Sequence, residues 1–451
     1  MKNDGASDSN SSNQSTAEAP DRLTKDGRRA LVAAVTGTVI EWYDYALYGA
    51  AAGLVIGPLF FENASIGSQL AAFATFAVGF VSRPLGGILV GHIGDKYGRR
   101  PALMLSVILM GVATVGIGLL PTEAAIGLAA PLLLVLFRMI QGLGAGAELA
   151  GAMTLVAEFA PRNKRGLLTA IVLSSPPAGI VLATGAFLIA SSFGDEILLG
   201  GAWRVPFLVS ALLFFVALFI RKHLEETPEY VAAMEERAQR EKELKLPLGQ
   251  LLRRRKKEVA VGFFSMTGHN ALNYTMAVFA LSLMTSDAVG LQRTEALTAV
   301  MIGTMCAIFT TPFGGMLADR FGAGTILATG SLLGAIFAFP LLAGLTSGNA
   351  TIATVVIALG YGGIIALTSG GQGAFIANLF PPEERYSGTA LAREFNGALV
   401  AGFTPLVMAW VMQETNNHIG LSGAALALPL LSSVVAIAWW QRTHAANQLA
   451  Y

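Results

Sequence analysis

Residues 323–345 read AGTILATGSLLGAIFAFPLLAGL and contain no charged side chain. An α-helix rises about 1.5 Å per residue, so roughly 20 apolar residues are enough to cross the ~30 Å hydrocarbon core of a bilayer. Glycine and proline are common within such runs, because neighbouring helices can satisfy the backbone that they free. The stretch therefore predicts a transmembrane helix.

The whole chain has the composition of a membrane protein. Of its 451 residues, 54% are hydrophobic and only 13% are charged, and the mean hydropathy is +0.60. Soluble proteins carry about 25% charged residues. A chain with so few charges cannot cover itself with a water-compatible surface, so we expect its exterior to contact a lipid bilayer.

Eleven further apolar runs accompany the first. With it, the predicted spans lie near residues 30–56, 68–90, 101–120, 128–157, 166–192, 203–220, 258–286, 295–317, 323–345, 350–378, 387–412 and 420–440. One long hydrophilic segment, residues 221–257, holds 18 charged side chains and separates six spans from six. We therefore predict an all-α membrane protein with twelve transmembrane helices in two six-helix halves.

The same pattern predicts the domain organisation. We expect a disordered tail at 1–29, an N-terminal six-helix bundle at 30–220, a linker at 221–257, a C-terminal six-helix bundle at 258–440 and a short tail at 441–451. Of the 30 Lys and Arg residues, 25 lie in the tails and the even-numbered loops. Such residues are retained on the cytoplasmic side, so we expect a multi-pass cell-membrane protein with both termini in the cytoplasm.

Several classes of function are disfavoured by composition. The single cysteine, Cys306, excludes an intramolecular disulfide and any metal site built from several thiolates. The net charge of +1 gives no reason to expect nucleic acid. No segment matches GxxxxGK(S/T), so ATP is not the expected energy source. We expect no enzyme activity, no cofactor and no resident metal.

Two pairs of segments repeat along the chain. GAMTLVAEFAPRNKRGLLTA at 151–170 resembles GQGAFIANLFPPEERYSGTA at 371–390, and GHIGDKYGRR at 91–100 resembles GMLADRFGAG at 315–324. Both pairs lie about 220 residues apart, which is typical of a duplicated six-span unit.

The loop at 91–100 fits GxxxD(R/K)xGR(R/K) at every specified position. Its glycines permit close helix approach, Asp95 can face the N-terminus of a neighbouring helix, and Arg99 and Arg100 can anchor to the cytoplasmic leaflet. The motif resembles the signature loop of the major facilitator superfamily. Three stretches, TVIEWYDYALYGAAAGLVIGPLFF, RMIQGLGAGAELAG and LEETPEY, further resemble its metabolite:proton symporters, and among these the shikimate and organic-acid transporters most.

This resemblance implies a proton-coupled symporter that imports a small organic acid, shikimate-like or another hydroxylated or aromatic carboxylate, by alternating access. Span five lacks the GPxxGG-like element usual in proton antiporters, which favours uptake over efflux. The expected partners are the organic acid, protons and the bilayer, and we expect a monomer.

Three alternatives stay open. One is a proton-coupled osmolyte symporter for proline or betaine, although members that sense osmotic strength carry a long C-terminal coiled coil and this chain ends eleven residues after Trp440. A transporter-like membrane receptor is an alternative of another class, but residues 221–257 are too few for an independent output domain. A channel is the third, and the repeat and the charge pairs favour rocking over an open pore.

Eight charged residues fall within the predicted spans, and each would cost roughly 3 kcal/mol if it faced lipid. They are Glu41, Asp44, Glu148, Glu394, Arg83, Arg138, Arg204 and Arg393. A carboxylate in a partly dry cavity can bind and release a proton near neutrality. We expect Asp44 to carry the coupled proton, with Glu41 and Glu148 as further candidates; the alternative is a structural acid paired with Arg138.

The predicted substrate contacts centre on Arg83, since a planar guanidinium recognises a carboxylate. They are Arg83, Tyr43, Tyr48, Arg204, His269, Asn270, Asn273, Tyr274 and Gln372. The alternatives are helix packing for Arg83, an interface anchor beside Trp203 for Arg204, and a helix–helix hydrogen bond for His269.

A third set is expected to form a charge network or gate. It comprises Arg138, Asp95, Arg99, Arg100, Asp319, Arg320, Arg393 and Glu394. We expect Arg138 to pair with the acids of span one, and Arg393 and Glu394 to find partners on different helices, because adjacent helical residues point about 100° apart. The family resemblance implies that Asp95 faces the N-terminus of span eleven, near Ser387, Gly388 and Thr389, when the cytoplasmic side is closed.

Overall fold

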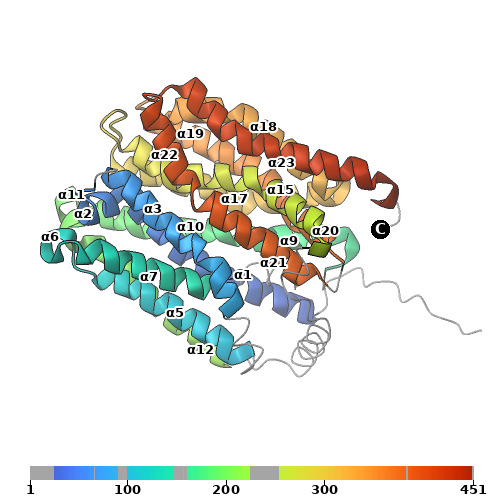
Figure 1. Ribbon diagram of the computed structural model, residues 1–451, viewed down its shortest axis with the longest axis horizontal. Coiled ribbons are helices and arrows are strands. Elements are labelled where there is room, and N and C mark those ends of the chain that lie inside the picture. Colours follow the sequence, from blue (N-terminus) through green and yellow to red (C-terminus); the bar gives the residue numbers. More distant parts are fainter. Residues whose placement is uncertain are drawn as a thin grey trace, which may run out of the picture.

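The computed structural model describes residues 25–64, 67–89, 99–146, 156, 160–223, 253–381 and 384–448. Within these ranges the secondary structure is helical, and no strand occurs among them. Long helices run side by side, and the described ends of the chain lie at the same end of the bundle, called here the termini end (Figure 1).

The first six spans are built from helices that in several cases are broken. They are α1 (Lys25–Ala51) with η1 (Ala52–Ile56) and α2 (Gly57–Phe60); α3 (Ser68–Val81), whose helix continues to Leu89; α5 (Arg99–Leu119); α6 (Glu123–Ile126) and α7 (Ala129–Ala145); η2 (Arg162–Lys164), α9 (Arg165–Leu173) and α10 (Ser175–Ser191); and α11 (Asp195–Ile197), η3 (Leu198–Ala202) and α12 (Arg204–His223).

The second six spans are likewise single helices or groups of consecutive shorter helices. They are α15 (Lys256–Tyr274) with η4 (Thr275–Phe279) and α16 (Ala280–Met284); α17 (Arg293–Phe321); α18 (Ala323–Leu345); α19 (Ala350–Leu359) with η5 (Gly360–Ile365) and α20 (Ala366–Leu379); α21 (Arg385–Asn396) with η6 (Gly397–Ala401) and α22 (Thr404–Glu414); and α23 (Ile419–Gln448).

Each of the twelve predicted spans overlaps one of these helices or helix groups; residue 90 of the second span and residues 147–155 and 157 of the fourth lie outside the described residues. By length and hydropathy alone, seven could cross a membrane, or eight if the bent pair Asp195–Ala202 and Arg204–Phe215 is one span. Two more, Met104–Leu119 and Ala129–Ala145, are apolar but shorter. Large apolar side chains such as Leu132, Phe215 and Phe309 are at least 67% exposed, as expected where a helix faces lipid.

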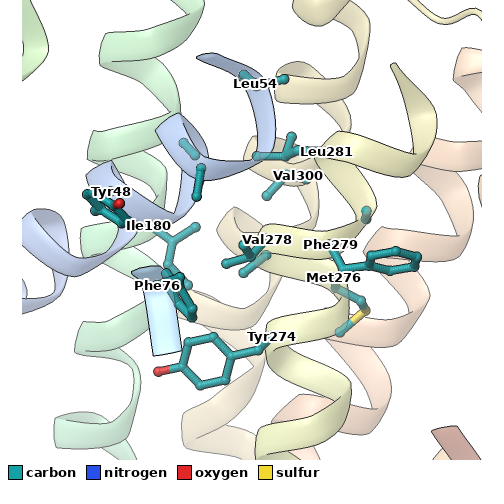
Figure 2. Packing of buried hydrophobic residues seen from close by; sticks show 14 of the residues in the cluster. Tyr48, Leu54, Phe76, Ile180, Tyr274, Met276, Val278, Phe279, Leu281 and Val300 are labelled. Carbon is teal, nitrogen blue, oxygen red and sulfur yellow. The ribbon is translucent and has the colours of Figure 1, made fainter. Parts of the chain in front are cut away.

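The helices form two groups that meet mainly where α9 and α10 pack against α17 and where α3 packs against η6 and α22. In Figure 1, α5, α7 and α12 lie at one edge of the bundle and α18, α19 and α23 at the other. α10 packs against both α1 and α17. Figure 2 shows the apolar core at this boundary, where Tyr48, Phe76 and Ile180 approach Tyr274 and Val278. We call α1 to α12 the N-terminal group and α15 to α23 the C-terminal group.

Small residues set how closely the helices approach. On α20, a Cβ at Gly370 would lie 2.2 Å from the carbonyl carbon of Gly314 on α17, and a Cβ at Gly314 would lie 2.1 Å from the carbonyl oxygen of Ala366. These atoms belong to the backbone and cannot rotate away. In a bilayer, close packing of this kind replaces much of the hydrophobic drive that holds soluble helices together.

Gly370→Ala should therefore destabilise the fold, because α17 and α20 must separate to admit the methyl group. Overpacking of this kind costs about 1–3 kcal/mol. Gly363→Ala is the matched control in the same span, since nothing lies within 4 Å of its added Cβ. Thermal unfolding in detergent should show a clearly lower midpoint for Gly370→Ala alone, and equal midpoints for the two variants would contradict the packing argument.

Candidate functional site

Arg83 lies buried where the two groups meet and forms two ion pairs. Its Nη2 donates to Glu41 Oε1 on α1 at 3.2 Å, and its Nε donates to Glu394 Oε2 on α21 at 3.1 Å. Arg83, Glu41 and Glu394 are only 6%, 2% and 9% exposed. One guanidinium therefore joins a helix of the N-terminal group to a helix of the C-terminal group through two carboxylates.

Aromatic rings surround this ion-pair cluster. Arg83 Cζ lies 4.9 Å from the ring centroid of Tyr45 and 5.7 Å from that of Phe80. Phe80 meets Tyr274 of α15 edge-on at 5.3 Å, and Trp42 stacks on Tyr274 at 6.2 Å. Rings exclude water, and a drier site strengthens the attraction between its charges.

Asp44, one turn after Glu41 on α1, belongs to a second buried cluster. Its Oδ2 accepts a hydrogen bond from Gln141 Nε2 at 2.6 Å, and the same nitrogen donates to Thr114 Oγ1 at 2.9 Å. The side-chain oxygen of Gln141 in turn accepts a hydrogen bond from Arg138. Among the described residues, no side chain or backbone group hydrogen-bonds to Asp44 Oδ1. Hydrogen bonds thus join Asp44 to Arg138 through Gln141.

Arg138 is buried where α7 packs closely against α3. The guanidinium donates to the carbonyl oxygen of Phe76 at 3.0 Å and lies 3.9 Å from the ring centroid of Tyr48. A Cβ at Gly79 would lie 2.2 Å from Arg138 Nη2, and a Cβ at Gly142 would lie 2.2 Å from the carbonyl oxygen of Gly79. Gly79 therefore leaves room for the guanidinium, and Gly142 lets α7 approach the backbone at Gly79.

Polar side chains of α15 bond to two other helices of the C-terminal group. His269 Nδ1 lies 2.8 Å from Thr368 Oγ1 on α20, and Asn270 Nδ2 donates to Asn396 Oδ1 on α21 at 2.5 Å. The His269 contact has the form of a helix–helix hydrogen bond. The carbonyl oxygen of Asn273 accepts from Tyr361 at 3.4 Å, and Gln372 is buried on α20.

Three other predicted substrate contacts bond within the N-terminal group. The Tyr43 hydroxyl donates to the carbonyl oxygen of Pro206 at 3.0 Å, and that of Tyr48 lies 2.5 Å from Thr75 Oγ1. Arg204 Nη2 donates to the carbonyl oxygen of Leu120 at 2.9 Å and its Cζ lies 4.5 Å from the Trp203 ring. The last arrangement matches the alternative interpretation of Arg204, an anchor beside Trp203.

The two groups also contact each other at the termini end. Asp319 of α17 accepts hydrogen bonds from the backbone nitrogens of Gly166 at 2.6 Å and Leu167 at 2.9 Å, and so caps the N-terminus of α9. Arg165 Nη1 donates to Asn378 Oδ1 on α20 at 3.2 Å. The second copy of the repeated motif thus places its aspartate against a helix N-terminus.

At the opposite end of the bundle, one more ion pair crosses between the groups. Arg293, the first residue of α17, pairs with Asp195, the first residue of α11. Both partners are at least partly exposed, so the contribution of this pair to stability is small.

Six predicted site residues remain: four lie wholly or partly outside the described residues, and two, Arg393 and Arg320, lie within them. Asp95 and Glu148 lie outside the described residues, as do the side chains of Arg99 and Arg100 at the start of α5. Arg393 is half-buried next to Glu394 in the chain, and its charge interacts with those of Glu394 and Arg83. Arg320 Cζ lies 5.1 Å from the Phe321 ring centroid.

Several hydrogen-bonding residues of these clusters were not predicted, among them Gln141 and Asn396. Gln141 stands three residues after Arg138, and Asn396 two residues after Glu394. A search for neutral hydrogen-bonding residues near each intramembrane charge would have found both. They were missed because only a charge carries a large penalty in lipid.

Comparison with known proteins agrees with this architecture. The family model described as Major Facilitator Superfamily matches residues 34–405. The chain is 38% identical to the inner membrane metabolite transport protein YhjE of Escherichia coli (strain K12), with 88% of this chain and 90% of that protein covered. It is 35% identical to the shikimate transporter of the same organism (85% and 87% covered). It is also 35% identical to the glycine betaine/proline/ectoine/pipecolic acid transporter OusA of Dickeya dadantii (strain 3937), with 88% and 80% covered.

Among solved structures, the chain resembles the partially occluded, inward-open xylose transporter XylE from E. coli. The TM-score is 0.70 at 19% identity, and the match covers 93% of this chain and 98% of that one. At this identity the likeness concerns the fold. The twelve-span helical architecture and the buried charges define a multi-pass membrane transporter rather than an enzyme. The chain belongs to the major facilitator superfamily.

The Asp319 cap should stabilise contact between the groups at the termini end. A carboxylate at a helix N-terminus contributes about 0.3–1 kcal/mol, and up to ~2 kcal/mol when partly buried. Asp319→Ala should shift the conformational equilibrium toward separation at that end by about fivefold for each kcal/mol lost. A cysteine introduced at Thr169, which is buried between α9 and α20, should then react faster with a water-soluble thiol reagent in a Cys306→Ala background.

Asp287→Ala is the control for this experiment, because Asp287 is an exposed acid that follows α16 at the other end of the bundle. It should leave the labelling rate unchanged. An equal rate in Asp319→Ala and in the parent would show that the cap does not hold the groups together.

Proposed function

We propose that the protein is a proton-coupled symporter that imports a small organic acid, shikimate-like or another hydroxylated or aromatic carboxylate. The observation that carries this proposal is the buried Arg83, held by two carboxylates and flanked by rings at the boundary between the groups. A guanidinium binds a carboxylate with two directed hydrogen bonds, and a ring-bearing acid can pack against the aromatic side chains. A shikimate transporter among the relatives supports this choice of substrate class.

A second candidate is a symporter for zwitterionic osmolytes such as proline or betaine. OusA, whose name includes those compounds, is as similar to this chain as the shikimate transporter. The carboxylate of proline or betaine would bind Arg83. Their cationic nitrogen would need an aromatic face such as those of Trp42 and Tyr274, or the Glu41 carboxylate.

Transport would proceed by rocking of residues 30–220 against residues 258–440, with both termini in the cytoplasm. The excess of Lys and Arg in the tails and even-numbered loops supports this orientation. The termini end would then be the cytoplasmic end, and the Asp319 cap would close that side. By the internal repeat, Asp95 would play the corresponding role toward Gly388 of α21.

Asp44 is the proposed carrier of the coupled proton. It is fully buried, one carboxylate oxygen accepts from Gln141, and the other receives no hydrogen bond from the described part of the chain. A buried carboxylate with an unsatisfied oxygen favours its protonated form, since burial penalises the charge. Glu41 and Glu148 remain further candidates.

The proposal is tested by uptake into proteoliposomes. Labelled shikimate, benzoate, proline and betaine are offered with and without an acidic exterior. We expect shikimate or benzoate to accumulate only with the pH gradient, by up to about tenfold per pH unit and coupled proton. Accumulation of proline or betaine alone would favour the second candidate, and absence of any uptake would favour a receptor.

Asp44→Asn should abolish accumulation driven by the pH gradient while leaving exchange of labelled for unlabelled substrate measurable. Exchange needs no net release of a proton, whereas accumulation does. Both are measured in the same proteoliposomes. Asp287→Asn, at an exposed acid, should behave as the parent does. Full accumulation by Asp44→Asn would remove Asp44 from the coupling mechanism.

Arg83→Lys should raise the apparent substrate constant by about tenfold or more. The ammonium keeps the charge but loses the planar pair of donors, and a hydrogen bond to a charged group is worth about 1.5–3 kcal/mol. The concentration dependence of uptake gives the constant. Arg442→Lys, at an exposed arginine of α23, is the control. A constant equal to that of the parent would leave Arg83 as a packing residue.

A further inference from the structure

We infer that the protein binds an anionic phospholipid at the termini end of the bundle, where the exposed sides of α15 and α23 both end in basic residues. The lipid phosphate contacts Lys257 and Arg442, and an acyl chain lies along the apolar side chains that lead to them. This site is separate from the Arg83 cluster, and it does not depend on which substrate the protein transports.

The exposed apolar side chains of α23 lead directly to an arginine. Leu428, Leu431, Val435 and Trp439 are 65%, 42%, 67% and 44% exposed, and they are spaced by three or four residues, so they share one face of the helix. Arg442 follows Trp439 by three residues and is exposed on the same face. Tryptophan is enriched where a membrane meets water, so Arg442 lies at the depth of the lipid headgroups.

The helix α15 has a similar exposed face. Phe264 is 46% exposed, Ala260 is exposed, and the exposed Lys257 lies three residues before Ala260 and seven before Phe264. On other sides of α15, His269 bonds to α20 and Asn270 bonds to α21. The exposed face therefore lies on the side of α15 that these two helices leave uncovered, and it too ends in a cation.

The two exposed faces are neighbours because α15 packs against α23. The Ser433 hydroxyl donates to the carbonyl oxygen of Phe264 at 2.7 Å and accepts from the backbone nitrogen of Gly268 at 2.8 Å. α15 begins and α23 ends at the termini end (Figure 1). At about 1.5 Å per residue, Lys257 lies about 10 Å and Arg442 about 14 Å from the Ser433 contact, in the same direction. The two cations are thus nearly level along the bundle, on adjacent helices.

The acids near these cations already have a partner. Glu258 and Glu384 both pair with Arg255, at 3.2 and 2.6 Å. The other cations here are exposed, and no acid among the described residues forms an ion pair with them: Arg253, Arg254, Lys256, Lys257 and Arg442. We call these five residues the basic patch. Its charge complements the phosphate of an anionic lipid, and a guanidinium can bind a phosphate with two directed hydrogen bonds.

The helix α17 provides a comparison at the same end of the bundle. Phe309, Phe313 and Met316 are 67%, 62% and 53% exposed and share one face, which ends at the exposed Arg320. The next helix in the chain, α18, adds no cation, because residues 323–345 contain no charged side chain. An apolar face that ends in a single arginine next to Asp319 lacks the charge density of the basic patch. Arg320 is therefore the matched control for Arg442.

The test measures lipid binding to the purified full chain by native mass spectrometry, with equal amounts of phosphatidylglycerol and phosphatidylcholine. We expect the protein to retain phosphatidylglycerol preferentially. Arg442→Gln should weaken this binding about fivefold, and Lys256→Gln, Lys257→Gln and Arg442→Gln together about a hundredfold, since each cation near an anionic headgroup contributes about fivefold. Arg442→Lys keeps the charge and should retain the preference, and Arg320→Gln should bind as the parent does.

The position of the lipid is tested by fluorescence quenching. Phosphatidylglycerol with brominated acyl chains should quench tryptophan fluorescence more than brominated phosphatidylcholine does, because the anionic lipid is held beside Trp439. Trp439→Phe keeps an apolar ring and should remove this difference between the two lipids. Glycerol phosphate has the phosphate without the acyl chains, and at the same concentration it should not displace phosphatidylglycerol.

Three results would overturn the inference. One is equal retention of the two lipids by the parent, and another is an equal loss of binding in Arg320→Gln and Arg442→Gln. The third is displacement by glycerol phosphate, which would identify a site for small anions instead of a lipid. If the triple variant does not fold, the comparison of the two single variants decides the question.

Discussion

A charged side chain inside a bilayer needs a partner from its own chain, since lipid supplies neither water nor counter-ions. Arg83 meets this requirement by contacting Glu41 on α1 and Glu394 on α21. The contact joins two groups of helices that otherwise meet largely through apolar and aromatic surfaces (Figure 2). The position of α21 against α1 and α3 therefore depends on the ion pairs that the buried Arg83 guanidinium forms.

Burying an arginine among helices demands space at the level of the backbone. Gly79 provides it for Arg138, Gly142 lets α7 approach the backbone at Gly79, and Gly314 and Gly370 allow α17 and α20 to pack backbone against backbone. In a soluble protein, water would screen such charges and the hydrophobic effect would hold the helices together. In a bilayer, directed hydrogen bonds must offset the buried charges, and close packing must hold the helices together.

The contacts between the groups lie at three levels along the bundle. Asp319 caps α9 at the termini end, the Arg83 cluster lies inward from it, and Arg293 pairs with Asp195 at the opposite end. The Arg293–Asp195 pair is partly exposed and contributes little to stability, whereas the two ion pairs of Arg83 are buried. A conformational change that separates the groups at the level of Arg83 would break its ion pair with Glu394.

The sequence by itself determined the twelve spans and the short list of charges inside them, because runs of apolar residues and the penalty for charge in lipid are local properties of the chain. Asp319, the aspartate in the second copy of the repeated motif, could also be recognised from the sequence. Only the tertiary structure decided that Glu41 and Asp44, three residues apart, belong to different clusters, that Gln141 joins Asp44 to Arg138, and that Arg83 meets Glu394. Such pairings join residues up to 311 positions apart, and they depend on how the helices rotate and cross, which no local pattern of residues encodes.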